Sequence, residues 1–332
     1  MIKILLLQDL RNNGGTRQAM KLVETNGMTN LTIGLIVPNI FGIKPMYQLF
    51  KDLYYYFFSQ KSFKKLKLIS KKLTASEDYL IISTSKKTLL YVSNIDSKYH
   101  THYCQHIEVW DLYNSAAFIK CCEDKGYLNP KMLLSFIKNN IYLSPGDFGY
   151  FNSLGRVKSF YTVSDFLKSI LSLYNPTASI KNIPVTPHIK NFHGKEIKKI
   201  RGSILFFLRG NNMKGDNLIL KLIFSDLSQK KIILVLSYRP RSSFIKKLKI
   251  HNIDFYIKPT DIILSEIYSV AETVIHPSLC EGFGSVPQEA IQFNCKVIAS
   301  KTGWLYNSES SLNIRVVKRH RTDDYVKETI SI

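Results

Sequence analysis

Two glutamates bracket a short glycine-rich segment in the last quarter of the chain. Glu281 and Glu289 are separated by seven residues, and Gly282 and Gly284 lie between them. A carboxylate only accepts hydrogen bonds and repels phosphate, so both glutamates suit hydroxyl groups such as those of a sugar and a ribose. The pair therefore indicates a ligand that offers hydroxyls at two places, unless both are solvated surface carboxylates.

The residues between the glutamates predict a loop that enters a helix. Pro277, Gly282 and Gly284 prevent a regular element after an apolar run. Ser285 is expected to cap the helix, and Glu289 is expected just inside it, where the helix dipole favours an anion. A helix start presents free backbone N–H groups, and glycines let a ligand approach them closely. A diphosphate would fit there, so the ligand is predicted to be a nucleotide diphosphate sugar.

The segment resembles a known signature. The string His-Pro-Ser-x-x-Glu-Gly-Phe-Gly-x-x-x-x-Glu-Ala, which begins at His276, resembles that of GT-B glycosyltransferases, particularly glycosyltransferase family four. The resemblance implies an α/β GT-B fold, with two Rossmann-like doubly wound domains facing a central cleft, and retention of anomeric configuration. It implies a catalytic role for Glu281 and substrate contacts from Glu289 and from the loop and helix start, Gly282, Phe283, Gly284, Ser285 and Val286.

A second glycine-containing segment supplies positive charge. An apolar run at 203–208 predicts a buried parallel strand, followed by Arg209-Gly-Asn-Asn-Met-Lys-Gly and a helix from Asp216. The segment resembles the Gly-Arg…Lys-Gly region of the family, which implies that Arg209 and Lys214 hold the donor diphosphate and assist catalysis. Arg209 precedes its glycine, so it matches the family pattern less well than Lys214. Without the resemblance, both could be ordinary surface cations.

Three further sites are assigned by resemblance alone. Gly14 and Gly15 follow the first predicted strand, where the family places a turn near the donor phosphates or the acceptor; an ordinary tight turn also fits. The segment at 99–110 resembles the Gln-x-x-Glu region of capsular and rhamnan-type transferases, which implies substrate contacts by Gln105, His106 and Glu108. The nucleotide base is expected against the loop that begins at Ile257.

Metal chemistry is not expected. His100, His102 and His106 lie within seven residues, but their spacing is not helical and no fourth ligand is evident. The sequence contains no Asp-x-Asp, which argues against the metal-dependent transferase fold. We therefore expect no metal and no cofactor beyond the donor substrate.

Length and charge set the wider organisation. A chain of 332 residues predicts two domains, placed at 1–180 (acceptor-binding) and 181–332 (nucleotide-sugar-binding), with the linker at 177–201. The net charge of +21 predicts anionic partners, which could be nucleic acid, an acidic membrane surface, or phosphorylated sugars and glycan carriers. The partners expected with the predicted reaction are the nucleotide sugar and a glycan or lipid-linked acceptor. No nucleic-acid-binding motif is evident, so nucleic acid is not expected.

The segment at 47–73 gives a membrane hypothesis. It interleaves seven lysines with aromatic and aliphatic residues and contains one acid. Such a basic amphipathic helix could lie on an anionic bilayer, although a core helix with a solvated lysine face fits equally. No transmembrane segment is evident, and five irregularly spaced cysteines fit a reducing compartment. We therefore expect a cytoplasmic protein, and the membrane hypothesis adds peripheral attachment to the inner face of the membrane.

The elements expected to position these residues alternate between strand and helix, which favours doubly wound parallel sheets. Strands are predicted at 1–9, 31–37, 79–83, 99–110, 231–236, 255–259 and 296–300, short strands or a connector at 87–92, a Ser164-capped helix, and a helix at 261–269.

The predicted reaction is glycosyl transfer in bacterial surface polysaccharide synthesis. Three alternatives remain open from the sequence. They are an inverting transferase with Asp9, His102 or Glu108 as general base, a basic nucleic-acid-binding protein, and a non-catalytic subunit that binds a sugar nucleotide.

Overall fold

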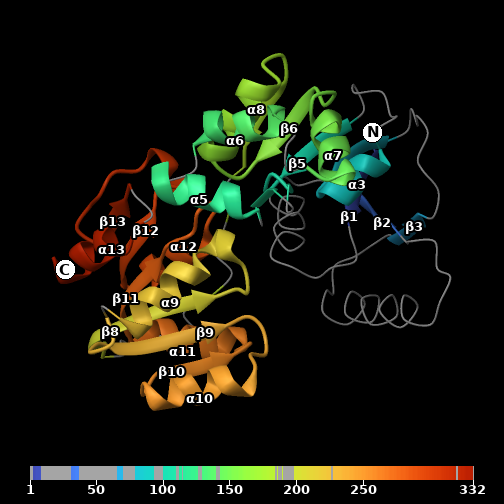
Figure 1. Cartoon of the computed structure of the whole chain (residues 1–332). Helices are drawn as coiled ribbons and strands as arrows, with labels where there is room; N and C mark the ends of the chain where they lie inside the picture. Colours follow the sequence, from blue (N-terminus) through green and yellow to red (C-terminus); the bar gives the residue numbers. More distant parts are fainter. Residues whose placement is uncertain are drawn as a thin grey trace. The chain divides into compact units, whose positions relative to one another are not determined.

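Two parallel β-sheets form the framework of the chain (Figure 1). The structure is a computed structural model, and it describes residues 3–8, 31–36, 66–69, 79–92, 100–109, 112–113, 115–125, 129–139, 143–183, 185, 189, 198–225, 227–318 and 321–331. Asp9, Gly14, Gly15 and residues 47–65 and 70–73 lie outside this part of the chain, so their predicted roles stay predictions.

The first sheet has seven strands in the order β3-β2-β1-β4-β5-β6-β7. Each strand runs parallel to its neighbours. The strand order reverses between β1 and β4, which is the arrangement of a doubly wound sheet. The strands are β1 (Lys3–Gln8), β2 (Leu31–Ile36), β3 (Leu66–Ile69), β4 (Tyr79–Ser83), β5 (His100–Cys104), β6 (Ser159–Thr162) and β7 (Ser179–Asn182).

Helices α3 (Lys86–Tyr91), α7 (Pro145–Leu154) and α8 (Asp165–Tyr174) accompany this sheet. The α3 helix corrects the prediction of strands or a connector at 87–92. Its start is a capping box, in which Thr88 N donates to Ser85 Oγ at 3.3 Å and Ser85 N donates to Thr88 Oγ1 at 2.8 Å. The predicted cap of α8 is confirmed, because Leu167 N donates to Ser164 Oγ.

Both edge strands of this sheet correct the sequence analysis. β3 lies within 47–73, so residues 66–69 are a strand and not part of an amphipathic helix. β7 lies within the predicted linker at 177–201. Its side chains are mostly exposed, so it lacks the apolar pattern that identifies a buried strand.

The second sheet has six parallel strands in the order β10-β9-β8-β11-β12-β13. The predictions at 231–236 and 296–300 match β9 and β12 to the residue, and those at 203–208 and 255–259 overlap β8 and β10. The strands are β8 (Ile200–Leu208), β9 (Lys231–Leu236), β10 (Asp254–Ile257), β11 (Ala271–His276), β12 (Lys296–Ser300) and β13 (Ile314–Val317).

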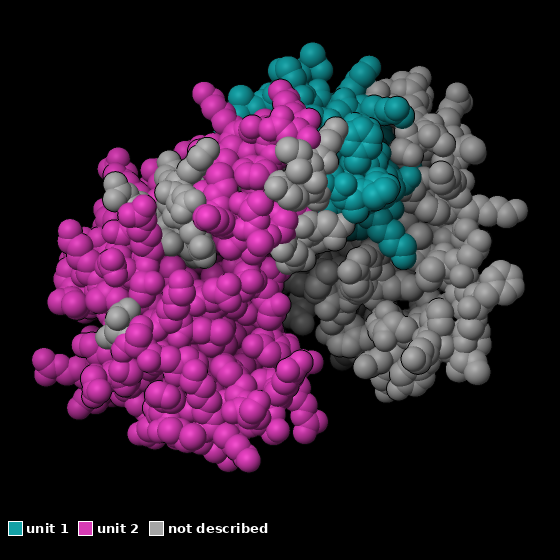
Figure 2. All heavy atoms as spheres, viewed as in Figure 1, with its two compact units in different colours: residues 1–109, 143–185 teal, residues 110–142, 186–332 magenta. Residues whose placement is uncertain are grey.

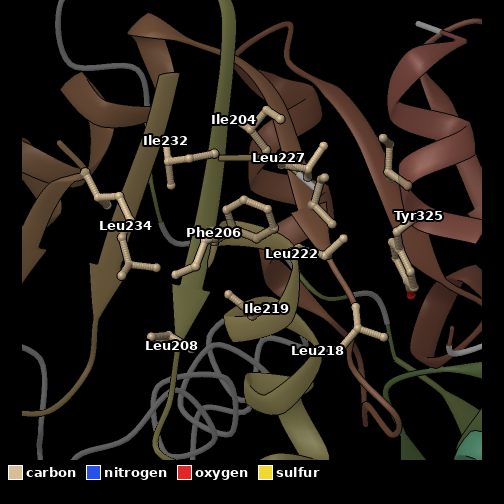
Figure 3. Packing of buried hydrophobic residues seen from close by; sticks show 14 of the residues in the cluster. Ile204, Phe206, Leu208, Leu218, Ile219, Leu222, Leu227, Ile232, Leu234 and Tyr325 are labelled. Atoms are coloured by element: carbon tan, nitrogen blue, oxygen red, sulfur yellow. The ribbon is translucent and has the colours of Figure 1, made fainter. Parts of the chain in front are cut away.

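Two apolar layers cover the faces of the second sheet. Alternate residues of β8 point to opposite faces: Phe206 packs with α9 and α13 in one core cluster, and Phe207 packs with α11 and α12 in the other. Figure 3 shows Phe206 among Leu222, Leu227 and Ile204. The helices are α9 (Asp216–Phe224), α10 (Ser242–Ile250), α11 (Asp261–Val270), α12 (Ser285–Gln292) and α13 (Thr322–Ile330), with the 3₁₀ turns η2 (Asn212–Lys214) and η3 (Gly303–Asn307).

The chain divides into two compact units (Figure 2). Unit 1 comprises residues 1–109 and 143–185, and unit 2 comprises residues 110–142 and 186–332. Unit 2 therefore also contains α5 (Ala116–Lys125) and α6 (Pro130–Lys138). Within the described ranges, no helix combines the length and the apolar character that crossing a bilayer would need.

The strand order of the second sheet reverses between β8 and β11, which lie side by side. In doubly wound sheets, ligands bind at the carboxyl ends of the strands where the order reverses. The loop after β8 carries Lys214, and the loop after β11 carries Glu281. The topology thus brings the two predicted charged segments together at the carboxyl ends of two neighbouring strands, β8 and β11.

Candidate active site

The loops after β8 and β11 pack directly against each other. Leu279 N donates to Met213 O at 2.8 Å, and Ser278 Oγ donates to the same carbonyl at 3.2 Å. Gly215 allows this approach, since its φ is +81° and a Cβ there would lie 2.0 Å from Pro277 O. The glycine is therefore required by both its backbone conformation and its neighbour.

Lys214 and Glu281 meet at this contact. Lys214 Nζ donates to Glu281 Oε2 at 2.7 Å and to Cys280 O at 3.3 Å. The two side chains are 22% and 12% exposed. An ammonium has three N–H donors, so one remains beyond these two contacts. Lys214 can thus hold the glutamate and still donate to an anionic ligand.

His276 is a second neighbour of Glu281. His276 Nε2 lies 3.1 Å from Glu281 Oε1, and the side chain is nearly buried. Burial on its own raises the pKa of Glu281, but the charge of Lys214 and the hydrogen bond from His276 outweigh it and hold the pKa well below the ordinary value of 4.5. Glu281 is therefore ionised at neutral pH. Each carboxylate oxygen keeps a lone pair for a ligand hydroxyl.

The start of α12 differs from the prediction that Ser285 caps it. Gly284 is the N-cap residue, with φ +89° and ψ +67°, and Ser285 is the first helical residue. Only glycine adopts this left-handed conformation readily, so the chain turns into the helix at Gly284. No side chain among the described residues caps the helix. The N–H groups at this end are thus not satisfied by a cap, as an anion site requires.

Glu289 lies in the second turn of α12, not in the first, so the dipole of the helix start does not account for its charge there. It is 5% exposed, and its Oε2 accepts a hydrogen bond from Tyr268 Oη at 3.0 Å. Tyr268 is fully buried between Phe207 and Phe293, with ring centroids 5.7 and 5.4 Å away. Glu289 is therefore held by a rigid aromatic stack.

Arg209 lies at the carboxyl end of β8. Its guanidinium carbon is 5.4 Å from the centre of the Phe207 ring, and the side chain is exposed. The loop that begins here is fixed by Asp216, whose carboxylate accepts from the N–H groups of Arg209 at 3.2 Å, Gly210 at 2.6 Å and Asn211 at 3.1 Å. The first residue of α9 thus shapes the loop that presents Arg209 and Lys214.

Ile257 ends β10, the edge strand of the same sheet, and is 37% exposed. β9 separates β10 from β8 in the sheet. Because the strands are parallel, Ile257 lies at the same carboxyl-terminal side of the sheet as the two loops. Its predicted contact with the base stays a prediction.

Three of the predicted substrate-binding residues belong to unit 1. Glu108 Oε1 accepts from Lys86 N at 2.8 Å, and His106 Nδ1 lies 2.9 Å from Ile107 O. Gln105 follows β5 in the same loop. The roles of these three residues in substrate binding stay predictions.

The two histidines of β5, His100 and His102, both form hydrogen bonds with one serine, Ser83. Ser83 Oγ lies 2.7 Å from His100 Nε2 and 2.8 Å from His102 Nδ1. Burial lowers the pKa of His100 to about 4 and that of His102 to about 3, which makes His102 a weak general base. In the described part of the chain, no cluster of three or more His, Cys, Asp or Glu side chains is placed to hold a metal ion.

Sequence reasoning missed several residues that hold this site. His276 belongs to the recognised motif, but no role was expected for it. Asp216 was expected only as a helix start. Tyr268 and Trp304 carried no signal, because their contacts with Glu289 and Gly284 span 21 and 20 residues in the sequence.

The chain resembles a known family over part of its length and solved structures over nearly all of it. Residues 190–317 match the family model of "Glycosyl transferases group 1". This match includes both loops, Lys214, Glu281 and Glu289. No protein of curated function matches the sequence significantly.

Solved structures resemble the chain over nearly its whole length. HepE from Anabaena, in complex with UDP and glucose, has a TM-score of 0.61 at 14% identity and covers 100% of this chain and 89% of its own. Sucrose-phosphate synthase from Thermosynechococcus elongatus has the same TM-score and coverage at 13% identity. WaaG, a glycosyltransferase involved in lipopolysaccharide biosynthesis, has a TM-score of 0.58 at 13% identity and covers 99% of this chain and 90% of its own.

At these identities the structures establish the fold alone, and the family model matches only the C-terminal part of the chain, residues 190–317. The prediction of two doubly wound α/β domains is thus confirmed. The chain has the GT-B fold and is a transferase, and its residues 190–317 match the model of the group 1 glycosyl transferases.

Proposed function

We propose that the chain transfers a sugar from a nucleotide diphosphate sugar to a glycan or lipid-linked glycan, with retention of anomeric configuration and without a metal ion. The reaction would serve the synthesis of a bacterial surface polysaccharide. The similarity to HepE, which was solved with UDP and glucose, and to WaaG supports the donor and acceptor classes.

One observation supports the proposal most directly. Lys214 lies 2.7 Å from Glu281, beside a helix start that no described side chain caps. A cation and free amide groups suit a diphosphate, and an ionised glutamate next to them suits sugar hydroxyls. The two halves of a nucleotide sugar would thus each meet a matching group.

The chemistry follows from charge. Cleavage of the bond between sugar and diphosphate leaves negative charge on the nucleoside diphosphate. In the proposed site, Lys214, Arg209 and the amide groups of 282–286 stabilise that charge. Glu281 orients sugar hydroxyls and stabilises positive charge on the ring, and Glu289 accepts from the ribose.

The proposal extends to the two domains, the nucleotide base and the location in the cell. Residues 1–180 would form the acceptor-binding domain, where Gln105, His106 and Glu108 contact substrate, and 181–332 the donor-binding domain. The nucleotide base would lie near Ile257. The protein would work in the cytoplasm, on the inner face of the membrane.

The test is a donor panel. The purified protein is incubated with UDP-, GDP-, ADP-, CDP- and dTDP-sugars, and thermal stabilisation and release of the nucleoside diphosphate are measured. The proposal expects stabilisation by at least one donor and slow hydrolysis that Glu281→Ala abolishes. Absence of both responses to every donor would contradict it. The anomer of the product tests retention.

A further inference from the structure

The segment that follows β12 holds the glycine loop at three points. Glu281 N donates to Thr302 Oγ1 at 2.9 Å, Trp304 N donates to Phe283 O at 2.9 Å, and Trp304 Nε1 donates to Gly284 O at 3.0 Å. All three contacts fall on the loop that joins Glu281 to α12. We refer to Thr302, Gly303 and Trp304 as the strap.

The strap is built for close contact. Gly303 has φ +60°, and a Cβ there would lie 2.1 Å from Phe283 O and 3.1 Å from Glu281 Cβ. Any other residue would push the strap away from the loop. Trp304 is half-buried and packs on the core cluster that contains Val286 and Ala290 of α12. The indole is therefore fixed on the same layer as the helix whose first turn it contacts.

These contacts set the direction of two amide groups. In a planar trans peptide, the C=O of one residue and the N–H of the next point in opposite directions. Trp304 binds the carbonyls of Phe283 and Gly284. The N–H groups of Gly284 and Ser285 must therefore point away from Trp304. They are the last amide before α12 and the first amide within it.

We propose that Trp304 is a positioning residue that fixes the N–H groups of Gly284 and Ser285 toward the donor diphosphate. The inference rests on the proposed function, because it assumes that the anion bound at this helix start is a diphosphate. Trp304 itself need not touch the substrate. Its indole N–H holds the Gly284–Ser285 peptide in one orientation, so that no binding energy is lost in ordering it.

The test compares nucleoside diphosphate with nucleoside. Trp304→Phe removes the indole N–H and keeps an aromatic ring in the core. The matched control is Ser308→Ala, which removes a hydrogen bond to Trp304 O at 3.4 Å but leaves the loop carbonyls bound. Dissociation constants are measured by calorimetry for the tightest-binding of UDP, GDP, ADP, CDP and dTDP, and for its nucleoside.

Trp304→Phe should weaken binding of the nucleoside diphosphate about five- to tenfold, the loss expected for one oriented hydrogen bond. The dissociation constant of the nucleoside should change by less than about twofold. Ser308→Ala should change neither dissociation constant. Equal weakening of both ligands, or unchanged binding of the diphosphate, would overturn the role of Trp304. A wild-type protein that binds none of the diphosphates would instead contradict the proposed function itself.

A second measurement tests the inference even if Trp304→Phe does not fold. The chain contains two tryptophans, so Trp110→Phe leaves Trp304 as the single one. The nucleoside diphosphate should then change the tryptophan emission, and the nucleoside should not. Tryptophan emission that does not change when the nucleoside diphosphate binds would overturn the inference.

Discussion

The ammonium group of Lys214 donates a 2.7 Å hydrogen bond to the carboxylate of Glu281, although their positions in the sequence differ by 67. This contact joins the loop after β8 to the loop after β11, the two strands between which the sheet order reverses. It places a cation for the diphosphate next to an anion for the sugar.

The ion pair predicts how stability depends on pH. Glu281→Gln should lower the free energy of unfolding by about 3 kcal/mol, because it leaves a mostly buried ammonium without its counter-charge. The folded pKa of Glu281 lies well below 4.5, so the stabilisation is complete above about pH 4.5 and is lost as the pH falls through the folded pKa. Urea unfolding of both proteins from pH 3 to 8 measures it.

The control for this variant is Asp254→Asn. Asp254 pairs with Lys231 at the same distance of 2.7 Å, but the two side chains are 46% and 37% exposed. An exposed pair contributes about 0–1 kcal/mol. A loss for Glu281→Gln no larger than that of the control would contradict the importance of the buried pair.

Gly215 predicts a steric requirement at the contact between the loops. Gly215→Ala should destabilise the protein by more than about 4 kcal/mol, since the new Cβ would lie 2.0 Å from Pro277 O and the residue has φ +81°. Gly202→Ala is the matched control, because Gly202 has φ +72° with no atom within 4 Å. It should cost only the left-handed backbone strain of about 1–2 kcal/mol. Similar losses in chemical denaturation would refute the loop contact.

Asp216 predicts that the loop after β8 depends on one carboxylate. Asp216→Asn should lower the free energy of unfolding by about 1–3 kcal/mol, because an amide cannot accept from all three N–H groups that the carboxylate binds. Asp323→Asn is the control: Asp323 is also in the first turn of its helix but is exposed, so only about 0.3–1 kcal/mol should be lost. Indistinguishable losses would rule out this role.

Tyr268 predicts a specific defect in donor recognition. Tyr268→Phe removes the hydrogen bond that Tyr268 Oη donates to Glu289 Oε2, so the KM for the donor should rise about tenfold with kcat unchanged within about twofold. Discrimination against donors with deoxyribose should fall as well. Tyr325→Phe is the control, since this buried hydroxyl bonds to Ser300 at 2.6 Å in the other core cluster. Retained discrimination in Tyr268→Phe would argue against the ribose contact.

The sequence predicted those elements that bury an apolar run. β9 and β12 were found to the residue because nearly all their side chains are buried, and Ser164 was found because a cap has a local signature. α3 was missed because it has only 6 residues, too few to show a helical period, and its apolar end resembles a short strand. β7 was missed because most of its side chains are exposed.

The candidate site shows the same division. Two sequence segments named Lys214, Glu281 and Gly284 as candidates from their types and spacing, and the structure brings Lys214 and Glu281 into contact. The sequence misplaced the helix cap at Ser285, because a left-handed Gly284 replaces the side-chain cap. The contacts of Tyr268 and Trp304 could not be predicted, since they depend on how separate elements of one sheet pack together.

The crystal structure of the chain with its tightest-binding nucleoside diphosphate tests the central claim most directly. We predict that the diphosphate lies within hydrogen-bond distance of the N–H groups of Gly284 and Ser285 and of Lys214 Nζ, with the ribose hydroxyls on Glu289. A diphosphate bound elsewhere, with the start of α12 and Lys214 free of it, would contradict the account.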